Sequence, residues 1–330
     1  KNIISRSLDF FAYKGAAVLM LDYDPSEYGK TLNPKELMSI LTKIHPALEH
    51  CARIERGSVS SGVHLTGTMR SESKGFHIYL PVLDASLIPV YGKLLCQYLW
   101  LNGYGYIALA SNGAKLARTC IDGSVFSPER LDFVGKPVIA GDGLIFTFPI
   151  MNHFEGGMLD LSTLPELDEG DLSLVNNLIE AAKEAIDGDS KDKSEVWAVD
   201  KIAKMEGNGT EEAKARKIIY TMLSNDCKDI YDEFPLEFAN GEGVTVADVI
   251  ANYKKYDDKA LADPIEGVDY GKTTAKFYWN NGKPFIYSFA HGESKYFLHS
   301  TIELMNAFSD NAKEKPKWKI EWDEHCAEWN

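Results

Sequence analysis

The sequence predicts a mixed α/β domain in which helices pack on a sheet, followed by a second region of different character. Three observations support this prediction. Strand-like and helix-like patterns alternate in the order β-α-β-β-α-β through the first half. The second half begins with amphipathic helical patterns and ends in short strands. Charge divides the chain similarly, because residues 1–150 contain 15 Lys and Arg against 13 Asp and Glu, whereas residues 151–330 contain 20 against 36.

The first strand is predicted in AAVLMLDYDP, an apolar run that ends abruptly at Asp22 and Asp24. Side chains at i and i+2 of a strand lie on the same face, so both carboxylates point the same way and Tyr23 points oppositely. Two neighbouring negative charges repel each other unless a cation lies between them. The pattern is therefore typical either of a solvated strand end before a Pro turn or of a divalent-metal site that needs a third ligand.

The first helix is predicted in TLNPKELMSILTKIHP. Asn33 is a plausible N-cap, and Pro34 suits the first helical position. Leu37, Ile40 and Leu41 form an apolar stripe. We therefore expect this helix to pack on the sheet through these side chains.

Further strands and a second helix complete the alternation. ARIERGSVSSGVHL contains strand-like pieces around a Gly/Ser loop, and GFHIYLPVLD is a compact apolar and aromatic strand. Asp84 is a candidate cap for a helix of about 85–102, which should end at NGYG. YGYIALAS, AKLARTCIDG and RLDFVGKPVI supply further strand material.

The second half is mainly helical before it returns to strands. DEGDLSLVNNLIEAAKEAI predicts an amphipathic helix, and the segment 187–195 is a polar linker. Helices are also predicted at 194–206 and at 210–224, the latter capped by Thr210. From residue 273 on, the pattern indicates three short strands joined by NNGK and HGES turns.

These patterns indicate two regions. Residues 1–165 form the first. Residues 166–330 form an acidic accessory region, with helices over about 166–255 and a small α/β module over about 256–330. Nucleic-acid binding would belong to the first region, since phosphate contacts need cationic side chains.

Composition narrows the class of protein. The five cysteines are scattered without C-x-x-C spacing, so we expect reduced thiols and no structural zinc. No apolar run approaches the length of a membrane span and no signal peptide is visible, so we expect a cytoplasmic protein without membrane contact. The chain begins with Lys1 rather than Met, as expected of an excised fragment.

A third carboxylate follows another apolar segment. Asp122 comes directly after KLARTCI. Three carboxylates at strand ends can bind two divalent ions, which activate an attacking hydroxyl and neutralise a triphosphate leaving group. Asp122 also fits the simpler role of a turn residue, and Asp132 in RLDF is its rival as the third carboxylate.

Two cationic or protonatable side chains could accompany these carboxylates. His77 lies in the strand SKGFHIYL, where it shares one face with Tyr79. A strand histidine is typically a hydrogen-bonded core residue, or else a donor to a phosphate oxygen on an active face. Arg130 in SPER is either a surface turn residue or a fork-shaped cation for a triphosphate.

In this order, LMLDYDP, SKGFHIYL and CIDGSVFSPERLDFVGKPV resemble the motifs of the archaeo-eukaryotic primase superfamily. The resemblance is to the primase–polymerases of mobile elements such as prophages and plasmids. That family carries D-x-D or D-x-E at a strand end, an S-x-H strand, and a hydrophobic residue and Asp followed by V-[YF]-x-x-x-R. The resemblance covers roughly residues 10–145.

The resemblance implies a two-layer catalytic core with an RRM-like sheet in residues 1–165. It also implies DNA primase or DNA polymerase activity, that is, templated nucleotidyl transfer from NTPs or dNTPs with Mg²⁺ or Mn²⁺. The implied partners are a single-stranded DNA template and a replicative helicase, fused downstream or separate, in DNA replication of a mobile element.

The resemblance also assigns roles to individual residues. The metal ligands and catalytic residues would be three aspartates: Asp22, Asp24 and Asp122. His77 would contact a nucleotide phosphate. Arg130 matches the arginine that follows the third carboxylate, which favours Asp122 over Asp132.

One departure concerns nucleotide binding. The serine of S-x-H is replaced by Gly75, which removes one phosphate contact. Ser73 or Lys74 would then substitute for it as nucleotide-binding residues. Basic side chains are candidates for tracking the template: Arg53, Arg56, Arg70 and Lys115.

Other classes of protein remain open. The main alternative is a non-catalytic replication initiator, or a module that binds DNA or a helicase. A D-x-D glycosyltransferase has no reason to share the histidine strand, and an HAD phosphatase requires Thr or Val where this chain has Ser26. A template-independent transferase would share the same site. His291 is assigned to a turn, and the region around it to a structural accessory module.

Overall fold

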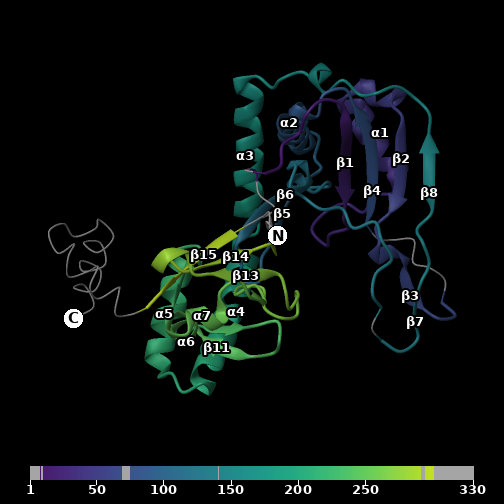
Figure 1. The fold of residues 1–330 in the computed structure, drawn as a ribbon. Helices are drawn as coiled ribbons and strands as arrows, with labels where there is room; N and C mark the ends of the chain where they lie inside the picture. The colour runs from purple at the N-terminus through teal and green to yellow at the C-terminus, as the bar shows by residue number, and fades with distance from the viewer. Residues whose placement is uncertain (1–7, 9, 69–74, 140, 291–293, 301–330) are drawn as a thin grey trace. The chain divides into compact units, whose positions relative to one another are not determined.

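The computed structural model describes residues 8, 10–68, 75–139, 141–290 and 294–300 (Figure 1). It is a mixed α/β structure with mainly antiparallel sheets, which confirms the general class predicted from the sequence. The chain divides into two compact units. Unit 1 comprises residues 1–108 and 115–187, and unit 2 comprises residues 109–114 and 188–330.

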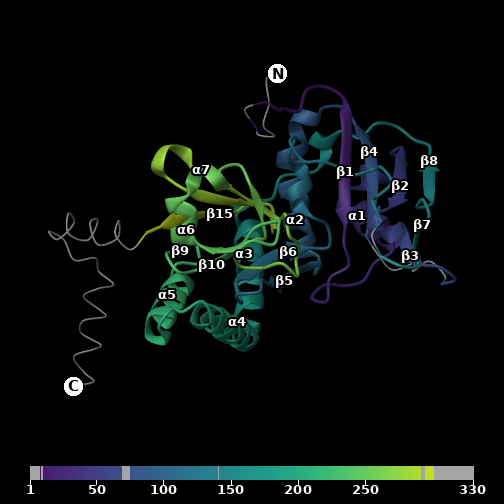
Figure 2. The same cartoon turned by 60° about the horizontal axis from the view of Figure 1, so that its bottom comes forward.

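Unit 1 is built on a four-stranded sheet in the order β1-β4-β2-β8 (Figures 1 and 2). These strands are β1 (Ala17–Tyr23), β4 (Phe76–Val82), β2 (Arg53–Gly57) and β8 (Met151–Phe154). Each neighbouring pair is antiparallel. β4 lies between β1 and β2. These two strands, which follow one another along the chain, are therefore not neighbours in the sheet.

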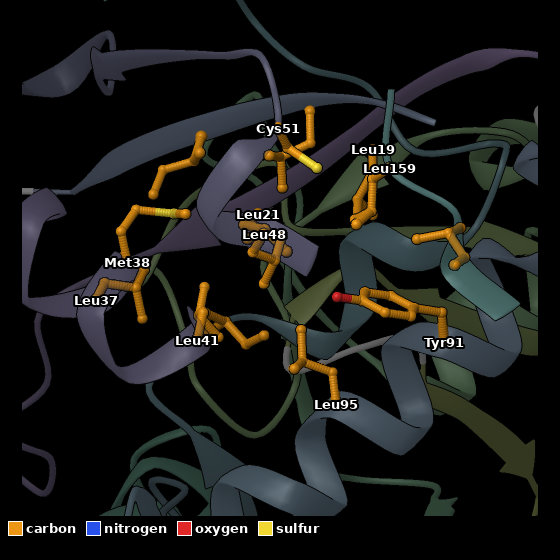
Figure 3. Close-up of a cluster of buried hydrophobic side chains, with 14 of the residues drawn as sticks. Leu19, Leu21, Leu37, Met38, Leu41, Leu48, Cys51, Tyr91, Leu95 and Leu159 are labelled. Atoms are coloured by element: carbon orange, nitrogen blue, oxygen red, sulfur yellow. The ribbon is translucent and has the colours of Figure 1, made fainter. Parts of the chain in front are cut away.

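Two helices cover one face of this sheet, α1 (Pro34–Ile44) and α2 (Ile88–Leu101). Leucines of β1 such as Leu19 and Leu21 are buried among side chains of both helices, as Figure 3 shows. Val18 lies on the opposite face and is 55% exposed. The alternation in β1 therefore separates a core face from a second face that no helix of this core covers.

The capping signal of α1 acts as predicted, whereas Asp84 caps a turn before α2 rather than α2 itself. Asn33 caps α1, since its side chain accepts a hydrogen bond from Glu36 N at 3.0 Å and Glu36 Oε2 accepts one from Asn33 N at 2.8 Å. Pro34 occupies the first turn, where no backbone donor is needed. Asp84 caps a short 3₁₀ turn that leads into α2 by accepting from Ser86 N.

The remaining elements of unit 1 are short, except for one helix. The strands are β3 (Val63–Leu65), β5 (Gly105–Leu109), β6 (Lys115–Thr119) and β7 (Leu144–Phe146); the 3₁₀ turns span Pro46–His50, Ser60–Gly62, Ala85–Leu87, Gly123–Phe126 and Leu161–Thr163; the helix is α3 (Glu169–Ala185). β3 pairs with β7 and β5 with β6. After β6 the chain reaches the end of β1, where Asp122 N donates to Asp22 O at 2.8 Å.

Helix α3 belongs to unit 1, because its apolar stripe packs against α2. Val175 is buried with Trp100 and Ile107. The compact units therefore divide after residue 187, beyond the boundary near residue 165 that the sequence suggested.

Unit 2 combines helices with a five-stranded sheet in the order β12-β13-β14-β15-β9. Its helices are α4 (Asp187–Gly207), α5 (Glu212–Ser224), α6 (Val246–Ala251) and α7 (Tyr253–Tyr256). Its strands are β9 (Asp229–Tyr231), β10 (Pro235–Glu237), β11 (Gly243–Thr245), β12 (Ala260–Leu261), β13 (Ala275–Tyr278), β14 (Phe285–Ser288) and β15 (Ser294–His299).

Two local predictions for this region are wrong. The polar linker predicted at 187–195 is the first part of α4, whose polar side chains bind backbone carbonyls: Ser190 Oγ donates to Gly113 O and Lys193 Nζ to Leu109 O. Thr210 is not the cap of α5, which begins after Glu211.

The helical region and the strand module predicted for the second half share one sheet, because a strand that follows the helices pairs with the strands near the end of the chain. β9 lies directly after α5, yet it pairs in parallel with β15 near the end of the described chain.

Within the described residues, no helix is both long and apolar enough to cross a bilayer. The four cysteines that the structure describes are free thiols.

Candidate functional site

Three polar side chains form a row across the sheet of unit 1, on the face opposite the helices. Asp22 of β1 pairs with His77 of β4, and His77 pairs with Arg56 of β2. Directly paired residues on antiparallel strands have neighbouring side chains on the same face. The register therefore brings together an acid, an imidazole and a guanidinium from segments far apart in the sequence.

His77 lies between two carboxylates. Its Nε2 is 3.3 Å from Asp22 Oδ1, and its Nδ1 is 3.3 Å from Asp132 Oδ1. The Tyr79 hydroxyl lies 3.0 Å from His77 Nδ1 and donates to Asp132 Oδ2 at 2.5 Å. These contacts fix the orientation of the imidazole ring.

The carboxylates also control the charge of His77. Burial by itself lowers its pKa, because a buried imidazolium loses hydration. Hydrogen bonding and charge from Asp22, together with the charge of Asp132, outweigh this effect and raise the pKa above its ordinary value. Arg56 opposes them. The imidazole is therefore biased towards its protonated form.

Asp24 lies just beyond the end of β1, beside the other two predicted metal ligands. Surrounding protein atoms desolvate its carboxyl and raise its pKa, and the charges of Asp22 and Asp122 raise it further. Its side chain nevertheless remains accessible to water. Asp24 is thus close enough to Asp22 and to Asp122 for both carboxylates to repel its charge.

Gly75 leaves the space that the Asp24 carboxylate occupies. A Cβ at position 75 would lie 2.2 Å from Asp24 Oδ1 and 3.0 Å from the carbonyl oxygen of Tyr23. A serine there, as in the S-x-H pattern, would displace the carboxylate. The departure from the pattern thus has a steric reason in this chain.

Asp122 serves as a turn residue and also lies beside Asp22. Its two carboxylate oxygens accept from Ser124 N at 2.8 Å and from Ser124 Oγ at 2.7 Å. Its backbone amide donates to Asp22 O. Asp132, its rival in the sequence, lies instead on the other side of His77.

The donor set of the three aspartates fits a hard divalent cation. Carboxylate oxygens are the preferred ligands of Mg²⁺. Among the described residues, the buried Asp22 Oδ1 has His77 Nε2 as an ion-pair neighbour at 3.3 Å but no well-aligned hydrogen bond. Among all the residues that the structure describes, no three His, Cys, Asp or Glu side chains are close enough together to hold a metal ion as they stand. A cation would therefore have to draw these carboxylates closer together.

Of the other predicted nucleotide-binding residues, the structure describes Arg130. Arg130 is half-buried, and its backbone amide donates to Ser127 O at 3.2 Å in the turn after Asp122. Ser73 and Lys74 lie outside the described residues, as do Arg70 and His291.

Arg56 is the cation that the sequence reasoning did not place at the site. It was a candidate for template contact only. Arg53 on the same strand lies on the opposite face, where Arg53 Cζ is 3.7 Å from the ring centroid of Phe154. The alternation within RIERG separates these two arginines, but only the pairing of β2 with β4 places Arg56 beside His77.

Comparisons with protein-family models, with curated proteins and with solved structures each give no match. Any assignment of function therefore depends on the residues and geometry of this chain.

Proposed function

We propose that this chain is a primase–polymerase, a nucleotidyltransferase that extends or initiates DNA-templated strands from NTPs or dNTPs. One observation carries the proposal: Asp22 pairs with His77 across the sheet, and Asp122 hydrogen-bonds to the backbone of Asp22. The three sequence motifs that resemble the archaeo-eukaryotic primases therefore meet at one end of β1.

The arrangement of unit 1 supports this proposal. The strand order β1-β4-β2, with α1 and α2 on one face, leaves the other face for the polar row. The segment after β6 reaches the outer edge of β1 at Asp122. We take this arrangement as support for the RRM-like catalytic sheet that the resemblance implies, which remains part of the proposal.

Asp22, Asp24 and Asp122 would hold Mg²⁺ or Mn²⁺. Such ions, when bound, activate a 3′-hydroxyl and neutralise the charge on the leaving pyrophosphate. The chain itself contributes carboxylates whose mutual repulsion favours a cation between them. The raised pKa of Asp24 reflects the desolvation of its carboxyl first and this repulsion second.

His77 would face the triphosphate of the incoming nucleotide. Its ring is oriented from the Nδ1 side by Tyr79 and Asp132, so that Nε2 is directed towards Asp22. A protonated imidazole in this place supplies positive charge beside the metal-binding carboxylates. Single-stranded DNA would be the template, and a replicative helicase would be the partner protein.

Primer synthesis on single-stranded DNA tests the proposal. The wild type, an Asp22→Asn/Asp24→Asn double variant and a control, Asp142→Asn, are incubated with labelled nucleotides and Mg²⁺ or Mn²⁺. Asp142 is an exposed aspartate of unit 1. We expect product from the wild type and the control but not from the double variant.

The other outcomes separate the alternatives. No product from a folded wild type that binds DNA would favour a non-catalytic initiator. Equal product from the double variant would contradict the assignment of the site while leaving the activity in place.

A further inference from the structure

Arg56 is a largely buried cation with unused hydrogen-bond donors. Its side chain is 11% exposed, and among the described residues neither Nε nor Nη2 has a hydrogen-bond partner. Native proteins rarely leave a buried donor unpaired, because the donor loses its bonds to water and gains none in return. Two unpaired donors on one guanidinium therefore indicate a ligand that accepts both.

The nearest carboxylate does not meet this need. Asp132 Oδ1 lies 3.7 Å from Arg56 Nη2, which is beyond hydrogen-bond distance. Its other oxygen, Oδ2, is held by the Tyr79 hydroxyl at 2.5 Å. Asp132 Oδ1 is itself buried without a hydrogen-bond partner in the described part of the chain. The two groups attract each other without forming a bidentate pair.

We propose that Arg56 and His77 together form the binding site for the triphosphate of the nucleotide, and that Asp132 competes with the triphosphate for the Arg56 guanidinium. The inference rests on the proposed function for the identity of the ligand. A guanidinium offers two parallel N–H donors that match two oxygens of a phosphate group. Arg56 is the direct cross-strand neighbour of His77, so one phosphate chain can contact both.

This proposal differs from the role that the sequence suggested for Arg56, which was contact with the template. It also differs from a metal-ligand role for Asp132. If the support that Asp132 gives to the His77 ring were its dominant role, its loss would weaken nucleotide binding. If it competes for the guanidinium, its loss strengthens binding of a polyanion. Arg56 and Asp132 substitutions therefore have opposite predicted signs.

The test is equilibrium binding of inorganic triphosphate and of dATP to the full chain by calorimetry, without divalent metal. The variants are Arg56→Gln and Asp132→Asn, with Lys43→Gln as the control that removes an exposed cation from α1. We expect Arg56→Gln to weaken binding of both ligands about tenfold or more, since it removes a charge-assisted bidentate contact. Asp132→Asn should strengthen binding about threefold, and Lys43→Gln should leave it unchanged.

Unchanged affinity in Arg56→Gln, or weaker binding in Asp132→Asn, would overturn the proposal. Arg56→Lys provides a second variant if Arg56→Gln does not fold, because it keeps the charge but loses the fork. It should bind triphosphate more weakly than the wild type. An effect of Arg56→Gln on a dT20 oligonucleotide but not on triphosphate would assign the residue to the nucleic-acid backbone, against the proposal.

The outcome of the binding experiment can be distinguished from the outcome of primer synthesis. Triphosphate binding that depends on Arg56, in a chain that makes no primer, would support the anion site and contradict polymerase activity. Primer synthesis that is unaffected in Arg56→Gln, with unchanged triphosphate binding, would contradict the anion site alone.

Discussion

Substitution of Gly75 by alanine should disable the site while leaving most of the fold intact. The added Cβ would lie 2.2 Å from Asp24 Oδ1, whereas ordinary contacts begin at 3.4 Å. The carboxylate must therefore move by roughly 3.4 − 2.2 = 1.2 Å. Metal–ligand distances tolerate changes of only about 0.2 Å, so a Cβ that pushes Asp24 out of this space should hinder its carboxylate from joining a metal site with Asp22 and Asp122.

The magnitudes follow from the atoms involved. A misplacement of about 1 Å at a reacting centre can cost about 100-fold in rate, so we expect a loss of that order in nucleotide incorporation. Overpacking costs about 1–3 kcal/mol. The cost here should lie near the lower end, because the most crowded atom is the end of a mobile side chain. The added Cβ would also lie 3.0 Å from Tyr23 O, and this close contact can be relieved only by a small shift of the backbone.

The assay combines primer extension, which measures activity, with urea unfolding monitored by circular dichroism, which measures stability. Gly135→Ala is the matched control, since a Cβ at position 135 meets no atom within 4 Å. We expect the control to retain both activity and stability. Full activity in Gly75→Ala with an unchanged free energy of unfolding would refute the reasoning, because Asp24 would then not need the place that Gly75 leaves open.

Three further predictions concern stability. Asn33→Ala should lower the free energy of unfolding by about 1 kcal/mol, measured by thermal melting, because the capping box of α1 is lost while the sheet is untouched. His45 is buried and has a lowered pKa, mainly through burial, so the unfolded chain takes up its proton first as pH falls. Stability should therefore fall below about pH 6.5, the ordinary pKa of histidine, and urea unfolding of His45→Gln should show a smaller decrease; an identical decrease would contradict the assignment. Burial lowers the pKa of Lys201 to about 8, so the wild type should gain stability between pH 8 and pH 10.5 relative to Lys201→Met. At about 1.4 kcal/mol per pH unit over this interval, the gain is at most about 3.5 kcal/mol; parallel stability curves for the two proteins would contradict it.

Local sequence patterns were sufficient to predict the elements that build the core of unit 1. The apolar runs gave β1 and β4, and the stripe with its Asn33 cap gave α1. These features depend on residues close in sequence, whose periodicity and capping chemistry are visible without the fold. The three aspartates and His77 could be proposed for the same reason, since each follows or lies within such a run.

The partners of His77 could not be predicted, because they depend on long-range pairing. Arg56 meets His77 only through the register of β2 with β4, and a shift by one residue would move it to the other face. Asp132 reaches the row through an irregular segment between the 3₁₀ turn after Asp122 and β7, whose path has no sequence period.

The extent of unit 1 depended on packing rather than on composition. The acidic character of α3 suggested that it belongs to the second region, but Val175 is buried beside Trp100 of α2. Burial of one apolar stripe outweighs the charge of the solvated face, so the helix remains with the first unit.

Template-dependent incorporation tests the central claim most directly. The wild type is given each labelled deoxynucleotide and ribonucleotide separately, on oligo-dT or on oligo-dC, with Mn²⁺ or Mg²⁺. The account predicts incorporation of adenine nucleotides only on oligo-dT and of guanine nucleotides only on oligo-dC. Incorporation that ignores the template would indicate a template-independent transferase, and no incorporation by the folded, DNA-binding protein would contradict polymerase function altogether.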